Sequence, residues 1–525
     1  MNSSTEAADD WTLPAQGSGA STFIQANALL LVYGLLCGLS LIPFLAIAQP
    51  PIVDFANHAA RLTMACHQHD PAIAAMYRYR FDIIPNLTID AVNLPLCGVV
   101  TPTRVLQLVT AGSLSLIYLS GWIIQRKLFG RANVFVLLLP AIAFNLVTTM
   151  GYINFLAGVA LACLMIAFAI GRQHRFTSLL LLCNLGGLVL FFCHIFALGF
   201  AMLIFFGLML GDSAITWKRI FNAGMRTILL FALPLALVAF VPAGGGGLII
   251  GYDDKLRELP PLIMGRHASP RIWGLALSCA LYLALKRKVI CLHRDLQVPL
   301  AIGVLFVILA PNRIQDGFDI DVRLAVPLAY LCFAALQPLR NYRRSNAVVT
   351  LVAAVLTGSQ LWALASIWEP FSGQVDEFRA ATAILPAHAR VLPVFNADGP
   401  RLTAGSSAYV HLTSYAVIDR RIFNPLEFTG AGMQPLSVTP AYAAISPGVG
   451  AILDRDTTNR LARPDALTEK AARKSPMIRV TQNWPRKFDY VIFYHFGGTP
   501  NFNPALLQEV HRGSFFSILK VKKVD

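Results

Sequence analysis

The sequence predicts a polytopic α-helical membrane protein with about eleven transmembrane helices and a C-terminal α/β domain outside the membrane. Only 14% of the 525 residues are charged and 56% are hydrophobic, whereas a soluble protein carries about 25% charged residues. The hydrophobic residues form long runs, and basic residues cluster between the runs, as topology determinants do. The net charge of +15 is therefore explained by membrane topology, which predicts the lipid bilayer as a partner and no nucleic acid.

Eleven stretches are long enough to cross a bilayer with some tilt. They lie at residues 26–48, 102–124, 132–150, 153–170, 176–193, 195–211, 227–244, 271–285, 297–312, 323–339 and 347–368. The pair inside 176–211 has an alternative, which is one long kinked helix. Residues 1–25 are polar and acidic without a basic segment, which predicts a disordered cytoplasmic tail and no cleavable signal peptide.

Charge predicts the orientation of these spans. One set of loops is basic and nearly free of acids, and the positive-inside rule places it in the cytoplasm. Its basic residues are Arg126, Lys127, Arg131, Arg172, Arg175, Lys218, Arg219, Arg226, Lys286, Arg287, Lys288, Arg294, Arg340, Arg343 and Arg344. The N-terminus is then inside, and the loops 49–101, 245–270 and 312–322 face outside. The membrane module is expected at 26–368, and residues 369–525 lie outside.

Residues 369–525 differ in pattern from the apolar runs. Three segments, "ARVLPVF" (389–395), "FDYVIFYHF" (488–496) and "FFSILKVKK" (515–523), have the composition of strands. A polar stretch near 463–475 is expected to be helical. About 155 residues suffice for one small domain, so the sequence predicts a mixed α/β domain docked on the outer face.

The first outer loop, 49–101, is long for a simple connection. It begins with "PPIVDFANHAARL" (51–63), in which Asp54, His58 and Arg61 are spaced to share one face of a helix over 54–68. Asp54 has the alternative role of capping that helix, and His58 and Arg61 that of a solvated face. Farther along, Pro85 and Pro95 bracket a short amphipathic segment that could lie on the membrane surface.

Other groups in this loop leave alternatives open. Asp82 and Asp90 can either act chemically or pair with Arg78 and Arg80 at the surface, where such pairs contribute little. The cysteines Cys66 and Cys97 both fall in the loop, and they are either disulfide-bonded or free, because spacing alone does not decide.

Later outer ends of the spans add polar groups. "FNLVTTMGYINF" carries Tyr152 and Asn154, "FFCHIFALGF" carries His194, and "APNRIQDGFDIDVRLAVP" carries Arg313 and Arg323. Charges at membrane boundaries are costly unless they are paired or near water, so they are functional candidates. Snorkelling of Arg323 and simple packing of His194 are the alternatives. An arginine can hold a phosphate and a carboxylate can take a proton from a hydroxyl, so Asp54, Asn154, His194 and Arg323 are expected to converge on one outer-leaflet site.

These strings are similar to those of a known family. "VDFANHAARL" resembles the D-x-x-N-H-x-x-R start of the first outer loop in bacterial membrane glycosyltransferases of the GT-C superfamily, and "IPNLTIDAV", "GYINFLAG" and "DIDVRLAVP" resemble further elements of an uncharacterised subgroup. The resemblance covers about residues 26–340. It implies a transferase that uses a polyprenyl-phosphate sugar donor on the outer face, in the bacterial inner membrane with a periplasmic C-terminal domain. The acceptor would be an envelope glycan or lipid, and the anomeric carbon would be inverted.

The resemblance also implies roles for individual residues. Asp54 would be the catalytic base, Asp82 or Asp90 a second acid, and Arg323, Arg313 and His194 would hold the donor phosphate. The residues expected to bind or orient the acceptor are Asn57, His58, Arg61, Tyr152 and Asn154. No Asp-x-Asp or Glu-x-Asp pair follows the first span, so no metal ligands are assigned and no cofactor is expected, although a divalent cation stays open.

Two other functions compete with a transferase. A transporter or flippase of lipid-linked saccharides should show paired broken helices near the midplane, whereas these polar groups gather at one face. A non-catalytic scaffold with a glycan-binding outer domain is the third hypothesis.

Overall fold

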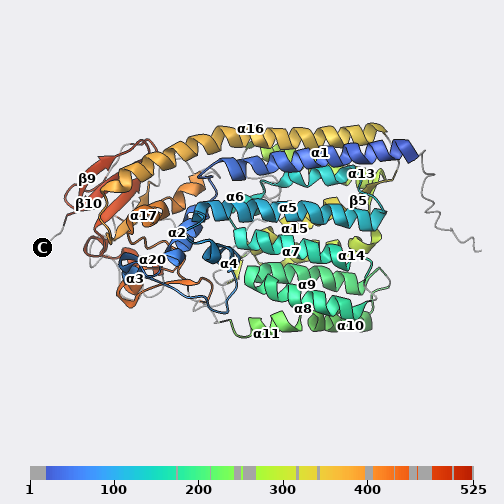
Figure 1. The fold of residues 1–525 in the computed structure, drawn as a ribbon, viewed down its shortest axis with the longest axis horizontal. Coiled ribbons are helices and arrows are strands. Elements are labelled where there is room, and N and C mark those ends of the chain that lie inside the picture. Colours follow the sequence, from blue (N-terminus) through green and yellow to red (C-terminus); the bar gives the residue numbers. More distant parts are fainter. Residues whose placement is uncertain are drawn as a thin grey trace, which may run out of the picture.

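The structure is a computed structural model, and it places a helical bundle at one end of the molecule and a sheet-containing region at the other (Figure 1). It describes residues 19–522 apart from 173–174, 213, 242–249, 252–267, 312, 315–318, 340–342, 397–405, 431, 449–457, 459–475 and 499–501. Most of the predicted tail 1–25, the outer loop 245–270 and the polar stretch 463–475 therefore lie outside the described residues.

Roughly aligned helices build the bundle (Figure 1). They are α1 (Gly19–Ala46), α5 (Pro102–Phe129), α7 (Ile153–Ala169), α8 (Phe176–Cys193), α9 (Ile195–Leu210), α10 (Trp217–Leu230), α11 (Ala232–Val238), α13 (Ala268–Lys286), α14 (Arg294–Leu309), α15 (Ile320–Ala335) and α16 (Arg343–Ala381). Two short antiparallel pairs connect them, β2 (Ile250–Gly251) with β4 (Arg313–Ile314) and β3 (Ile290–Leu292) with β5 (Leu336–Pro338).

Four of the described helices are long and apolar enough to cross a bilayer, namely α1, α5, α8 and α16, and the bent pair α10–α11 would add a fifth if it forms one span. Large apolar side chains also stand exposed on the outside of these helices. Among them are Leu31, Leu35, Leu181, Leu185, Leu351 and Val355. An exposed apolar surface of this kind is unusual for a soluble monomer. The number of eleven spans stays a prediction, because the other predicted stretches form shorter helices.

The stretch predicted as a span at 132–150 is broken. It consists of the 3₁₀ turns η2 (Val134–Leu138) and η3 (Pro140–Ile142) followed by α6 (Leu146–Met150). Pro140 lacks an N–H and clashes with the carbonyl four residues before it, so a continuous α-helix is unfavourable there. Neighbouring helices satisfy the freed carbonyls, since Gln360 donates to Ala141 O at 2.8 Å and Tyr330 donates to Ile142 O at 3.2 Å.

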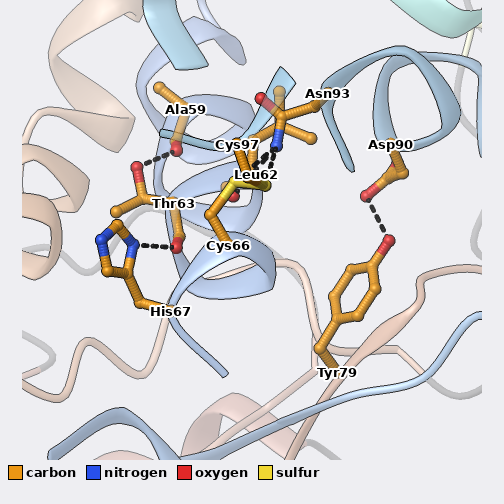
Figure 2. The surroundings of a disulfide bond; sticks show 9 residues. All are labelled: Ala59, Leu62, Thr63, Cys66, His67, Tyr79, Asp90, Asn93 and Cys97. Carbon is orange, nitrogen blue, oxygen red and sulfur yellow. Dashed lines mark hydrogen bonds between the residues drawn. A yellow bond between two sulfur atoms is a disulfide. The ribbon is translucent and has the colours of Figure 1, made fainter. Parts of the chain in front are cut away.

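The first outer loop folds into short elements at the end of the bundle. They are α2 (Phe55–Cys66), α3 (Pro71–Met76), β1 (Tyr77–Tyr79), α4 (Thr88–Asn93) and η1 (Leu94–Leu96). α2 confirms the helix predicted over 54–68. A disulfide joins Cys66 to Cys97, with 5.5 Å between the Cα atoms, and the Asn93 amide lies beside it (Figure 2). The disulfide ties the end of α2 to the end of the loop.

The C-terminal region contains a four-stranded sheet in the order β6-β8-β10-β9. β6 (Val391–Phe395), β8 (Tyr490–Tyr494) and β10 (Phe516–Val521) confirm the three predicted strands. β6 runs parallel to β8, and the other neighbours are antiparallel. The fourth strand, β9 (Leu507–Arg512), was not predicted. It lies at the sheet edge, and most of its side chains are partly or fully exposed. Its sequence therefore lacks the hydrophobic run from which a strand is predicted.

Short elements complete the C-terminal region. They are η4 (Thr382–Ile384), η5 (Ser406–His411), α17 (Ser414–Arg420), β7 (Leu436–Val438), η6 (Pro440–Ile445), α20 (Pro476–Thr481) and η7 (Trp484–Arg486). β7 pairs with β1 of the first outer loop. One hydrophobic core contains side chains of the sheet together with Ala60 and Met64 of α2. The first outer loop and the C-terminal region are thus packed together, and α16 continues through the boundary predicted at residue 369.

Candidate functional site

Asp54 lies in the turn that leads into α2, at the end of the helical bundle. Its N–H donates to Met150 O at 3.1 Å, which holds the turn against the end of α6. Gly151 makes this close approach feasible. Its φ is +84°, and a Cβ there would lie 2.8 Å from Ile52 Cγ2 and 3.0 Å from Asp54 N. The Asp54 side chain makes no capping hydrogen bond to α2, so the capping alternative does not describe this carboxylate.

The Asp54 carboxyl group has an environment that suits proton transfer. Its side chain is 14% exposed. Burial raises its pKa to about 7, while the charge of Arg323 acts to lower that pKa and the charge of Asp319 acts to raise it. A general base works best when its pKa is near the working pH. Asp54 is thus able to take up a proton near neutral pH.

Arg323 stands in the first turn of α15, among side chains from other parts of the bundle. Its guanidinium lies over the Tyr152 ring, 3.5 Å from the ring centre. Tyr152 in turn donates from its hydroxyl to Asp319 Oδ2 at 2.9 Å. Arg323 is 9% exposed, and its Nε has no hydrogen-bond partner among the described residues. The stacked ring holds the planar cation, and part of its donor capacity stays unused.

His194 separates α8 from α9 and faces Arg323, with 3.4 Å between His194 Nε2 and Arg323 Nη1. The backbone N–H of Phe196 donates to His194 Nδ1 at 3.1 Å. Nδ1 is therefore an acceptor, so the proton of the neutral ring is on Nε2. Two N–H groups then point toward each other. Such a pair is stabilised by an acceptor placed between them, and an anionic oxygen would serve this purpose.

Asn57 and a residue that the sequence did not suggest, His411, complete the surroundings of Asp54. His411 lies at the end of η5, and its Nε2 is 3.6 Å from Asp54 Oδ1. The Asn57 amide contacts His411 Nδ1 at 3.3 Å and also holds the segment 426–428 against α2. No motif around His411 links it to Asp54, because the two residues come together only when the C-terminal region packs on α2.

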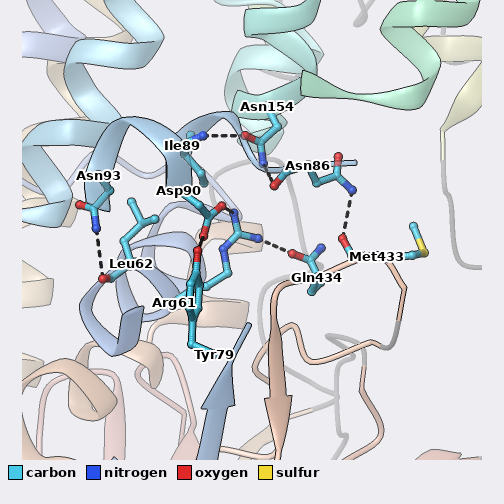
Figure 3. A network of polar contacts seen from close by, with 10 residues as sticks. All are labelled: Arg61, Leu62, Tyr79, Asn86, Ile89, Asp90, Asn93, Asn154, Met433 and Gln434. Carbon is cyan, nitrogen blue, oxygen red and sulfur yellow. Dashed lines mark hydrogen bonds and ion pairs between the residues drawn. The ribbon is translucent and has the colours of Figure 1, made fainter. Parts of the chain in front are cut away.

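Asn154 and two charged residues of the first loop hold the loop in place (Figure 3). Asn154 accepts from Ile89 N at 3.0 Å and donates to Asn86 O at 2.9 Å. Arg61 and Asp90 form an ion pair of 2.7 Å with both side chains fully buried. The predictions that Asp90 is a second acid and that Arg61 and Asn154 orient the acceptor remain predictions. The carboxylate oxygens of Asp90, the side-chain amide of Asn154 and the two Nη atoms of Arg61 bond to the protein itself. Arg61 Nε has no hydrogen-bond partner among the described residues.

The second oxygen of Asp90 and the second nitrogen of Arg61 are also bonded. Tyr79 donates to Asp90 Oδ1 at 3.1 Å, and Arg61 Nη1 donates to Gln434 Oε1 in the C-terminal region. Burial raises the pKa of Asp90, and Arg61 opposes this shift. The network therefore connects α2, β1 and α4 to the C-terminal region.

Asp90→Asn is expected to destabilise the protein by about 3–5 kcal/mol, because it leaves the buried Arg61 charge without its counter-ion. The apparent melting temperature of the detergent-solubilised chain measures this loss. The double variant Arg61→Met/Asp90→Leu should recover much of it. Arg512→Ala, which breaks the exposed pair with Glu509, is the matched control and should change stability by less than about 1 kcal/mol. Equal melting temperatures for Asp90→Asn and this control would contradict the prediction.

The remaining predicted residues are more scattered. His58 is buried beside the Phe428 ring, and burial followed by the charge of Arg61 lowers its pKa, so the ring is neutral. Asp82 is exposed. Arg313 lies in β4, and its side chain is outside the described part. The structure thus brings Asp54, Asn57, Tyr152, His194 and Arg323 to one end of the bundle.

Among the described residues, no group of three or more His, Cys, Asp or Glu side chains lies close enough together to hold a metal ion.

Two solved structures are similar to this chain. They are crystal structures of ArnT from Cupriavidus metallidurans, one in the apo state with a TM-score of 0.48 and one bound to undecaprenyl phosphate with a TM-score of 0.47. Each is 12% identical, and the match covers 96% of this chain and 98% of that chain. No family model matches the chain, and no curated protein matches it significantly. A similarity of this level carries no inference about activity, which depends on the side chains at the site.

Proposed function

We propose that this chain is an integral membrane glycosyltransferase that moves a sugar from a polyprenyl-phosphate donor to an envelope glycan or lipid acceptor. One observation carries the proposal. A nearly buried carboxyl group with a pKa near neutrality lies within electrostatic reach of Arg323. The Arg323 guanidinium faces His194, and its Nε–H has no partner among the described residues. A base beside an anion-binding pair is what a reaction needs when an acceptor hydroxyl displaces a phosphate.

The proposed reaction is a single displacement with inversion. Asp54 removes the proton from the acceptor hydroxyl, and the acceptor oxygen forms a bond to the anomeric carbon on the side opposite the phosphate. The bond from that carbon to the phosphate oxygen breaks, and its electron pair leaves with polyprenyl phosphate. Arg323 and the Nε2–H of His194 stabilise the charge on the leaving phosphate.

The surroundings of the site suit a lipid-linked donor. Exposed apolar side chains cover the outside of α1, α8 and α16, so the polyprenyl chain and the bilayer would meet the same surface. The donor phosphate would then lie at the end of the bundle, where the first outer loop and the C-terminal region cover it.

The disulfide and the charges support a periplasmic location of the site. Disulfides form and persist in the periplasm and other oxidising compartments, and Cys66–Cys97 is on the same side as Asp54. The basic residues Arg126 and Lys127 are in the last turn of α5, a helix that begins on the side of the site. The positive-inside rule then supports a bacterial inner-membrane protein with a cytoplasmic N-terminus and a periplasmic C-terminal region.

A reporter fused after residue 525 should therefore register as periplasmic. Alkaline phosphatase at this position is expected to be active, and green fluorescent protein exported to the same place is expected to be dark. The matched control is the same pair of reporters inserted after Asp212, in a loop predicted to be cytoplasmic, which should give the opposite result. A fluorescent C-terminal fusion with an inactive phosphatase would overturn the orientation.

The function itself is tested with the full-length chain in lipid nanodiscs. Lipid-linked sugars extracted from bacterial membranes are supplied together with envelope glycan and lipid fractions. We expect free polyprenyl phosphate to appear with a glycosylated product, and mass spectrometry detects both. Transport of the intact donor into closed vesicles without formation of free polyprenyl phosphate would instead indicate a flippase. Failure of every fraction to yield product would count against the transferase.

A further inference from the structure

The C-terminal region places His411 beside the candidate base. His411 is 4% exposed, and its Nε2 lies 3.6 Å from Asp54 Oδ1. This distance is slightly longer than a hydrogen bond. Hydrogen bonds in active sites are often long without substrate and shorten when substrate binds. The contact is therefore close enough to become a hydrogen bond with a small movement of either side chain.

The neighbours of His411 determine which of its nitrogens carries the proton. The Phe428 N–H donates to Asn57 Oδ1 at 3.3 Å, and Asn57 Nδ2 donates to Leu426 O at 3.2 Å. These two contacts fix the orientation of the Asn57 amide, so it is the NH₂ group that faces His411 Nδ1 at 3.3 Å. An NH₂ group can only donate, so His411 Nδ1 has to accept and the proton of the neutral ring is on Nε2.

The Nε2–H of His411 consequently points toward the Asp54 carboxylate. Burial lowers the pKa of His411 to about 4, so the ring stays neutral near pH 7. A neutral donor of this kind stabilises the ionised form of a neighbouring carboxylate and holds one of its oxygens. The other oxygen, Oδ2, is then left to receive a proton.

We propose that His411 is a positioning residue for Asp54, supplied by the C-terminal region and held in its donor tautomer by Asn57. It orients Oδ1 of the carboxylate so that Oδ2 faces the acceptor hydroxyl, and it favours the charged form that a base requires. This inference rests on the proposed function of Asp54. The site is therefore complete only when the segments 406–411 and 424–428 are packed on α2.

The α2 helix is buried along its length, from Phe55 to Ala65. It packs against both α5 of the bundle and α17 of the C-terminal region. Asn57 bonds to segment 426–428 and to His411 at once. The position of the C-terminal region relative to Asp54 therefore depends on its contacts with α2, the helix that follows Asp54.

The variants His411→Phe and His411→Gln test the proposal. Phenylalanine keeps the ring volume and removes the donor, whereas the glutamine amide can place an N–H near the position of Nε2. The first measurement is the pH dependence of Asp54 labelling by dicyclohexylcarbodiimide, a reagent that reacts with protonated carboxyl groups. Peptide mass spectrometry measures the labelled fraction. The charged and titratable groups near Asp54 and His411 are Arg323, Asp319, Tyr152, His58 and Arg61, and all of them stay unchanged in these variants.

We expect His411→Phe to move the labelling midpoint of Asp54 upward by about one pH unit, because the carboxylate loses a donor. The kcat for sugar transfer should fall about tenfold or more, as for other orienting partners. His411→Gln should lie between the wild type and His411→Phe in both measurements. His495→Phe, which removes another buried histidine of the C-terminal region, is the matched control and should leave the midpoint unchanged.

The outcomes separate this inference from the proposed function. An unchanged midpoint and an unchanged kcat in folded His411→Phe and His411→Gln would overturn the positioning role. If His411→Phe shifts the midpoint but the wild-type chain shows no transfer activity, the proposed function would be overturned, while the coupling of His411 to Asp54 would stand. If His411→Phe does not fold, His411→Leu replaces it as the variant without a donor, and wild-type values in both measurements would again overturn the role.

Discussion

Asp54→Asn is expected to reduce sugar transfer by about 100- to 10,000-fold, the range that general-base catalysis contributes. The amide has nearly the same size as the carboxyl group but cannot take a proton from the acceptor. Expression and melting temperature should stay close to the wild type, since the Asp54 side chain makes no capping hydrogen bond to α2. The measurement is the initial rate of polyprenyl phosphate release by the chain in nanodiscs.

The pH dependence gives the same prediction a second test. A base has to be deprotonated to act, and burial raises the pKa of Asp54 to about 7. The value of kcat/KM should therefore rise as the pH increases through about 7, and the residual rate of Asp54→Asn should lack this rise. Asp212→Asn, which changes an exposed acid in the predicted cytoplasmic loop, is the control. Full activity in Asp54→Asn would remove Asp54 from the role of base.

Arg323→Ala should lower kcat/KM for the lipid-linked donor by about 100-fold or more, because it removes a cation that balances the leaving phosphate. The KM for the acceptor should change much less. Arg323→Lys keeps the charge but loses the planar fork and its stacking on Tyr152, so we expect it to restore only part of the rate. Initial rates with donor and acceptor varied in turn distinguish the two effects.

The control for Arg323 is Arg104→Ala, which removes an exposed arginine at the start of α5. It should leave both kinetic constants close to the wild type. Equal losses of donor and acceptor use in Arg323→Ala would point to a structural role of the stacked guanidinium. A loss confined to the acceptor would assign Arg323 to the acceptor side of the site.

The helices and strands with strong patterns could be predicted from the sequence. α1, α5 and α16 follow long apolar runs, α2 follows the spacing of its polar residues, and β6, β8 and β10 follow runs of β-branched and aromatic residues. Two predictions from patterns failed for different reasons. Residues 134–150 are broken because the ring and missing N–H of Pro140 oppose a continuous helix, and Gln360 and Tyr330 satisfy carbonyls beside the break. β9 is held as an edge strand by pairing with β10.

The candidate site, too, could be predicted only in part from the sequence. Charge and topology were enough to predict that Asp54, His194 and Arg323 lie at one end of the bundle, because each follows or begins a span whose orientation the basic loops determine. Charge and topology were not enough to predict that Asp90 is buried in an ion pair with Arg61. They also did not predict the disulfide between Cys66 and Cys97. Both depend on distances between segments that only the folded loop defines.

The sequence by itself determined a largely apolar chain of helices, a long polar loop after the first of them and an acid at its start. Only the tertiary structure decided which groups that acid meets. His411 is 354 residues from Asn57 along the chain, and no local pattern encodes a contact over such a separation. The physical reason is that the pKa and orientation of a carboxylate depend on burial and on nearby donors. Here the bundle supplies Arg323 and the C-terminal region supplies His411.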